Sequence, residues 1–178
     1  MGIQIGARPD AGFDDPIGML KDCHRRIERF LHILCLVAER GQGRALTEEE
    51  REAVQAALHY FRVGGVRHTA DEEESLFPRM RATAAAAPAV SELESLESDH
   101  RRANDLHDAV EMLYQAWITA GRLSQQDSER LLRATQQLGQ LYEAHIRLEE
   151  GTVFPRAAEM LDPQTIASIG QEFERRRK

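Results

Sequence analysis

Two segments of the chain carry the same arrangement of histidine, glutamate and proline. They read HTADEEESLFPR at residues 68–79 and HIRLEEGTVFPR at residues 145–156. Aligned on their histidines, both have Glu at the fourth and fifth following positions and Phe-Pro-Arg at the ninth to eleventh. Four residues make about one helical turn, so a histidine and the glutamate four positions later point the same way on a helix. Two such matches in one chain indicate that a structural motif is duplicated.

The repeat extends beyond these two segments. DCHRR at residues 22–26 matches SDHRR at residues 98–102, and each of these pentapeptides has its histidine in the middle. His24 and His68 are separated in sequence by nearly the same number of residues as the corresponding pair in the second half of the chain. The chain therefore reads as two helix hairpins. Each hairpin contributes a histidine from its first helix and His-x-x-x-Glu from its second.

Helical periodicity organises the first half of the chain. A helix is expected over residues 15–40, followed by the helix-ending sequence GQG. Thr47 opens a capping box for a second helix, which we expect to run to about residue 77, where Pro78 interrupts it. The pair Gly64-Gly65 should weaken or bend this second helix.

The second half follows the same plan. After an alanine-rich connection that contains Pro88, a third helix is expected to run to about residue 120. Ser124 can open a fourth helix, with Pro155 near its end, and Asp162-Pro163 starts a short terminal helix. Long helices joined by short connections predict an all-α, up-down-up-down four-helix bundle. The expected divisions are an N-terminal extension at 1–14, the bundle at 15–158 and a C-terminal helix at 159–178.

The repeated histidines and glutamates fall on helix faces that are otherwise apolar. Six side chains are thereby expected in the core: His24, His68, Glu72, His100, His145 and Glu149. Two carboxylates buried without compensation would each cost several kcal/mol, on the order of the penalty for an unpaired buried charge. Bound cations would compensate them, and imidazole with carboxylate suits iron, manganese or zinc. Two bridging carboxylates suit a pair of metals roughly 3.5–4 Å apart.

This pattern resembles the hemerythrin-like family in its bacterial His-His-Glu form. The resemblance covers about residues 15–158 and includes LFP and VFP after the two acidic motifs. It implies a non-haem di-iron centre in the bundle core, with two oxo- or hydroxo-bridged iron ions. By the same resemblance, Glu72 and Glu149 bridge the irons and the four histidines are terminal ligands.

The chain departs from the oxygen-carrying members of that family, which have five histidines. Asn104 stands where they have a further histidine one turn after the ligand on the third helix. Three other histidines are expected to be core or surface residues out of reach of the metal pair: His32, His59 and His107. The loss of one imidazole leaves more open or water-filled coordination. This favours redox chemistry or sensing over simple reversible oxygen carriage.

Several neighbours of the expected ligands have interpretations other than ligation. Glu73 and Glu150 each point about 100° away from the preceding glutamate, so a solvated or hydrogen-bonding role is expected. Tyr142, one turn before His145, is expected to be a packed tyrosine. Cys23 faces away from the site and is interpreted as a helix thiol.

Three classes of function fit these residues. The first is a di-iron protein that binds or reacts with dioxygen, peroxide or nitric oxide, in sensing or stress protection, with an external electron donor. The second is a di-iron enzyme that consumes peroxide or reduces nitric oxide. The third is a metal-free helical interaction module. A ferritin-like oxidase fits poorly, because that fold needs Glu-x-x-His on two helices and only Glu97-x-x-His100 is present.

Charge and hydropathy exclude other partners. The chain has 23 Lys and Arg against 30 Asp and Glu, a net charge of −7. Such a surface repels phosphate backbones, so no nucleic-acid partner is expected. No apolar run approaches the ~20 residues that cross a bilayer, so no membrane partner is expected. The closing basic run, ERRRK, is interpreted as cations that favour the end of a helix.

The two cysteines, Cys23 and Cys35, indicate a reducing compartment. They lie on one expected helix, about 18 Å apart at the helical rise per residue, and cannot form a disulfide with each other. The first fifteen residues lack the cationic start and apolar stretch of a secretory signal. A cytoplasmic location is therefore expected.

Overall fold

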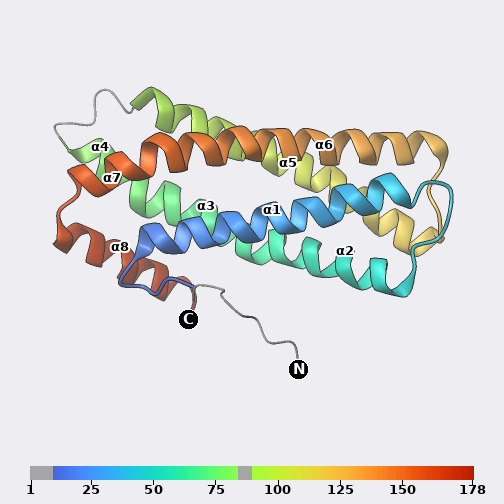
Figure 1. The fold of residues 1–178 in the computed structure, drawn as a ribbon, viewed down its shortest axis with the longest axis horizontal. Coiled ribbons are helices and arrows are strands. Elements are labelled where there is room, and N and C mark those ends of the chain that lie inside the picture. The colour runs from blue at the N-terminus through green and yellow to red at the C-terminus, as the bar shows by residue number, and fades with distance from the viewer. Residues whose placement is uncertain (1–9, 84–89) are drawn as a thin grey trace.

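The computed structural model describes residues 10–83 and 90–178, which are helical with no strand in those ranges (Figure 1). The first hairpin consists of α1 Pro16–Arg40, α2 Glu48–Tyr60, the π-helical segment η1 Phe61–Gly65, α3 Val66–Ala70, the π-helical segment η2 Asp71–Leu76 and α4 Phe77–Ala82. The second consists of α5 Val90–Ala120, α6 Gln125–Leu148, the π-helical segment η4 Glu149–Val153 and α7 Phe154–Met160, and α8 Pro163–Arg175 follows it. The connection around Pro88 and the first nine residues of the N-terminal extension lie outside the described residues.

Four long rods run side by side and antiparallel (Figure 1). They are α1, the continuous run from α2 to α4, α5, and the continuous run from α6 to α7. Short connections join the rods at one end of the bundle, and α8 packs beside α1 and η2 towards the other end. The predicted all-α, up-down-up-down bundle with a C-terminal helix is confirmed. No helix among the described residues combines the length and the apolar character that crossing a membrane requires.

Side-chain caps begin the helices where the sequence predicts. The carboxylate of Asp15 accepts a hydrogen bond from the Gly18 amide at the start of α1. Thr47 opens α2 with the expected capping box, and the side chains of Ser124 and Asp162 accept hydrogen bonds from the third following amide at the starts of α6 and α8. These caps satisfy amides that have no partner within the helix, which is why each boundary falls at the capping residue.

The apolar core is divided into two clusters. One lies towards the short connections and includes Trp117, Tyr114 and Leu34, while the other lies towards α8 and includes Phe77 and Phe154. On the first three rods, the predicted ligand residues fall between the positions that supply these two clusters, and on the fourth rod they fall where the two clusters meet. The polar site is therefore enclosed by apolar packing on both sides along the bundle axis.

Pro78 does not end the second rod, which continues to Ala82, so the predicted interruption near residue 77 was wrong. Proline lacks an amide hydrogen, and its ring crowds the carbonyl four residues earlier. Here Pro78 directly follows η2, and Pro155 directly follows η4. A π-helical turn does not require the hydrogen bond between a residue and the carbonyl four positions earlier, which is consistent with each rod continuing through its proline. The pair Gly64-Gly65 likewise falls within a π-helical segment, η1.

Candidate metal centre

The structure brings all six predicted ligand residues together in the middle of the bundle. Each is buried, and Glu72 and Glu149 are completely inaccessible to solvent. Their ligand atoms form two groups of four, within each of which all atoms lie within 4.8 Å of one another. One group is His24, His68, Glu72 and Glu149, and the other is Glu72, His100, His145 and Glu149. The two groups share both glutamates, which is the arrangement of a pair of neighbouring metal positions.

Each shared glutamate lies between the two hairpins. Glu149 approaches His145 on its own rod, with Nε2 and Oε2 3.3 Å apart, and His24 of α1, with 3.0 Å between the same atom types. Glu72 makes the matching pair of approaches. Its Oε1 is 3.3 Å from Nε2 of His68, and its Oε2 is 3.3 Å from Nε2 of His100. Each carboxylate therefore joins a histidine of one hairpin to a histidine of the other.

These short distances do not satisfy the polar atoms. All four carboxylate oxygens of Glu72 and Glu149 lack a hydrogen-bond partner, as do Nε2 of His24 and both ring nitrogens of His68. Buried carboxylates without partners are strongly unfavourable, so a cation bound between them would stabilise the arrangement. Imidazole nitrogen and carboxylate oxygen together suit iron, manganese or zinc. The donor set therefore fits a pair of such ions.

A second layer of carboxylates orients two of the histidines. Oε1 of Glu150 lies 2.8 Å from Nδ1 of His24, and Oε1 of Glu73 lies 2.8 Å from Nδ1 of His100. A carboxylate at Nδ1 keeps the proton on that nitrogen, which leaves Nε2 free to face a metal. Glu73 and Glu150 thus have the hydrogen-bonding role predicted for them. Each acts on the histidine of the opposite hairpin.

Comparison with known proteins agrees with this geometry. The family model described as "Hemerythrin HHE cation binding domain" matches residues 15–157. The chain belongs to the hemerythrin HHE family. An uncharacterized protein of Haemophilus influenzae is 26% identical to this hemerythrin-family chain over 168 residues, which is 94% of this chain and 93% of the relative.

The other two histidines of this hemerythrin-family site, His145 and His68, differ in what lies near their Nδ1 atoms. Asp99 of α5 lies 3.8 Å from Nδ1 of His145, too far for a hydrogen bond but close enough to favour a proton there. Sequence reasoning missed Asp99, because it acts across the α5–α6 interface rather than along its own helix. His68 has no such carboxylate at Nδ1, and its ring instead lies edge-on to His24 with centroids 5.0 Å apart.

The remaining histidines lie outside the hemerythrin-type ligand groups. His32 and His59 are exposed, in agreement with the prediction for them. His107 is half-buried, and its Nε2 lies 3.1 Å from the hydroxyl of Tyr142. Tyr142 and His107 line a surface pocket of about 350 Å³, together with Asn104 and Thr69. Tyr142 also packs against His145, with ring centroids 6.1 Å apart, so it contacts both the pocket and a predicted ligand.

Burial and mutual interactions shift the pKa values of the residues at the hemerythrin site in opposite directions. Burial and the adjacent Glu149 carboxylate raise the pKa of Glu72 well above its usual range. Burial also opposes ionisation of Glu149, but the nearby His145 and His24 together outweigh it and lower the pKa of Glu149 well below its usual range. Burial lowers the pKa of His145, and Glu149 more than offsets this, so that pKa is raised. Burial and the neighbouring His24 keep the pKa of His68 well below its usual value.

Metal binding should therefore release protons, and the affinity should rise with pH. A cation favours the deprotonated carboxylate and the neutral imidazole, so the proton on Glu72 has to leave. We expect Zn²⁺ to bind about tenfold more tightly per pH unit for each proton displaced. Titration with Zn²⁺ in weakly buffered solution with a pH indicator measures the release directly. Equal affinities at pH 6 and pH 8, with no proton release, would contradict this assignment of protons.

Proposed function

We propose that this protein holds two iron ions between Glu72 and Glu149 and uses them to bind or react with a small oxidant. The oxidant class comprises dioxygen, peroxide and nitric oxide, and the setting is sensing or stress protection. The four histidines are the terminal ligands: His24 and His68 on one ion, His100 and His145 on the other. An external donor supplies the electrons.

The observation that carries this proposal is the pair of buried carboxylates shared by two groups of ligand atoms. A single ion needs only one such group, whereas two groups with both acids in common match a two-metal site with roughly 3.5–4 Å between the ions. All four oxygens lack other partners, so nothing else in the described structure competes for them. When bound, an iron pair supplies electron transfer to a small ligand, which the side chains alone lack.

The surroundings support a small oxidant rather than a large substrate. Apolar clusters close the site on both sides along the bundle axis. The pocket lined by Asn104 and Tyr142 lies beside the site, and both residues are one turn from a proposed ligand, His100 and His145 respectively. Asn104 adds no imidazole, which leaves coordination positions for a small molecule. The Tyr142 hydroxyl, held by His107, can donate or accept a hydrogen bond on that side.

The test is to load the full chain anaerobically with Fe²⁺ and then expose it to each oxidant in turn. We expect about two irons per chain by elemental analysis, as the two ligand groups imply. We also expect a near-ultraviolet absorption change with at least one of dioxygen, peroxide and nitric oxide. The Zn²⁺-loaded protein is the matched control, because zinc has no redox chemistry and should show no change. The proposal would be wrong if the protein bound no transition metal, or if the absorption of the iron-loaded protein did not change with any of the three oxidants.

The same experiment separates a sensor from an enzyme. One equivalent of peroxide consumed per iron pair, with a persistent spectral change, indicates binding or sensing. Many equivalents consumed per pair, in the presence of a reductant, indicate catalytic turnover. The coordination positions that Asn104 leaves free are compatible with turnover, which is why the enzyme is the second candidate.

A further inference from the structure

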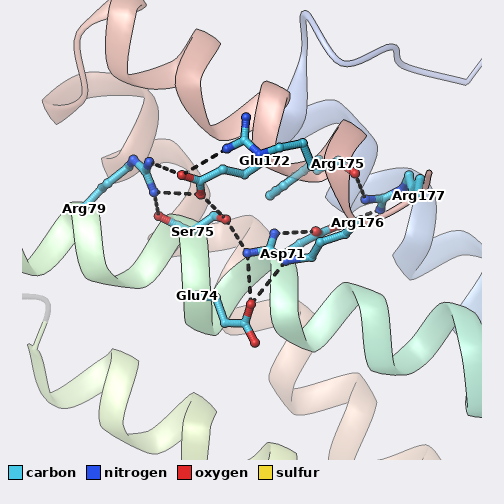
Figure 2. Close-up of polar contacts among 9 residues, drawn as sticks. Asp71, Glu74, Ser75, Arg79, Glu172, Arg175, Arg176 and Arg177 are labelled. Atoms are coloured by element: carbon cyan, nitrogen blue, oxygen red, sulfur yellow. Dashed lines mark hydrogen bonds and ion pairs between the residues drawn. The ribbon is translucent and has the colours of Figure 1, made fainter.

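The residue before Glu72 is a buried acid that contributes to neither ligand group. Asp71 is completely inaccessible to solvent. Its charge is met from the far end of the chain, where Nη1 of Arg176 lies 2.9 Å from Oδ1 and Nη2 of Arg177 lies 2.6 Å from Oδ2 (Figure 2). Both arginines directly follow α8. The basic run that the sequence indicated as a helix end is therefore a partner of the metal-binding rod.

Further contacts tie α8 to the same rod. Arg79 donates two hydrogen bonds to Glu172, at 2.6 and 3.0 Å, and the Ser75 hydroxyl donates to Glu172 at 2.6 Å (Figure 2). Arg176 also contacts Ser75, with Nη2 2.8 Å from Oγ. The links from Asp71 to Arg79 span the whole of η2. Glu72 is therefore carried on a segment whose polar face is held by α8.

The opposite side of α8 is packed closely against the N-terminal segment. A side chain at Gly170 would place its Cβ within 1.9 Å of the Phe13 carbonyl oxygen, so only glycine fits there. Phe173 of the same helix is fully buried in the apolar cluster near the site. Because this packing holds α8 in place, it also restricts the positions of the two arginines that follow the helix and contact Asp71.

The second hairpin lacks this arrangement. The residue before Glu149 is Leu148, which packs against the apolar cluster instead of forming an ion pair. Arg156, the counterpart of Arg79, pairs with Glu92 of α5 at 3.1 Å. The family match ends at residue 157, before α8 begins. The link to α8 thus belongs to one hairpin only and to a part of the chain outside the matched domain.

We propose that Arg176 and Arg177 are positioning residues that hold Glu72 in place through Asp71 and set the rate at which metal leaves the site. The proposal rests on the metal site of the proposed function. For an ion to leave, η2 must open far enough for Glu72 to turn away. Such opening strips Asp71 of its partners in the interior, so it is rare while the arginines are in place. Both arginines are about one-fifth exposed, so salt should weaken the contact in part.

The test compares Arg177→Gln and Arg176→Gln with Lys178→Gln in the full chain. Lys178 pairs with Glu174 on the same terminal turn but does not touch the metal-binding rod. In Zn²⁺-loaded protein, we expect each arginine variant to release metal to a chelator at least about tenfold faster than the parent, as expected when local opening becomes more frequent. Lys178→Gln should release metal at the parent rate.

A second readout does not depend on metal. In the metal-free protein, amide hydrogen exchange in residues 71–76 should quicken in the arginine variants, while exchange in η4 stays unchanged. A protein that binds no Zn²⁺ but shows this exchange pattern would sink the proposed function and leave the positioning role standing. Unchanged exchange in residues 71–76 would overturn the positioning role, whatever the metal content.

A double variant excludes a general loss of stability. Asp71→Asn removes the charge that the arginines serve, so adding Arg177→Gln to it should accelerate release little further. If the arginine instead stabilised the whole fold, its effect on the release rate would be as large in the Asp71→Asn background as in the parent. The release rate would then follow the rate of global unfolding. That result would overturn the proposal.

Discussion

Replacement of Glu72 or Glu149 by glutamine should empty the site of at least one metal ion while leaving the helix content near normal. Glutamine keeps the size of the side chain and its hydrogen-bonding capacity, but it removes the anion that two cations need between them. Each glutamate belongs to both ligand groups, so either change affects both positions. We expect the metal content by elemental analysis to fall to one ion or none per chain, with loss of the near-ultraviolet absorption expected of the proposed iron pair. Circular dichroism checks the helix content.

The matched controls are His32→Gln, His59→Gln and His107→Gln. His32 and His59 are exposed, and His107 is bonded to Tyr142 outside both ligand groups. All three variants should retain the metal content of the parent. If His107→Gln emptied the site as thoroughly as Glu149→Gln, the ligand assignment on α5 would be wrong.

Removal of the metal should lower the melting temperature by roughly 8–16 °C. An ion present at about a thousand times its dissociation constant stabilises the folded state by about 4 kcal/mol, and each kcal/mol shifts the midpoint of a chain this size by about 2–4 °C. Without metal, the orphaned oxygens of Glu72 and Glu149 must hold protons or water in the interior. Thermal unfolding with and without a chelator measures the difference.

Glu72→Gln provides the control for this second result. A variant that has lost one or both ions should show a smaller difference in melting temperature between the two conditions than the parent does, and no difference if both ions are lost. Equal midpoints for the parent protein under the two conditions would contradict the metal site as a whole, since stabilisation by mass action is unavoidable for a ligand that binds only the folded state.

The parts of the site that follow from helix geometry were predictable from the sequence. His68 and Glu72 share a face because four residues make about one turn, and the apolar residues on the same stripe indicate that this face is buried. The caps at Asp15, Thr47 and Ser124 are likewise local, since a side chain there reaches only the next turn. Convergence of the four faces followed from the duplication, because one hairpin with two polar stripes needs a partner with matching stripes.

Features that depend on distant contacts were not predictable in this way. Asp71 is the first of four consecutive acids, and nothing in that run marks it as ion-paired, because its burial depends on arginines more than 100 residues later. The π-helical segment η2 also could not be predicted from the spacing of apolar residues. A π-helical turn contains one extra residue, and over so short a stretch this shifts the apolar pattern too little to be detected. The basic run at 174–178 was interpreted from its own helix alone, whereas its partners lie on another rod.

The sharing of ligands between hairpins determines when the metal can act during folding. Each group of ligand atoms takes at least one member from each hairpin, because Glu149 completes the first group and Glu72 completes the second. A lone hairpin therefore offers an ion at most three of the four ligands of a group, and a complete group forms only when the two halves have docked. The ion thus contributes little to the speed of folding. It acts afterwards, by holding the docked halves together and slowing their separation, so its effect belongs to the lifetime of the native state.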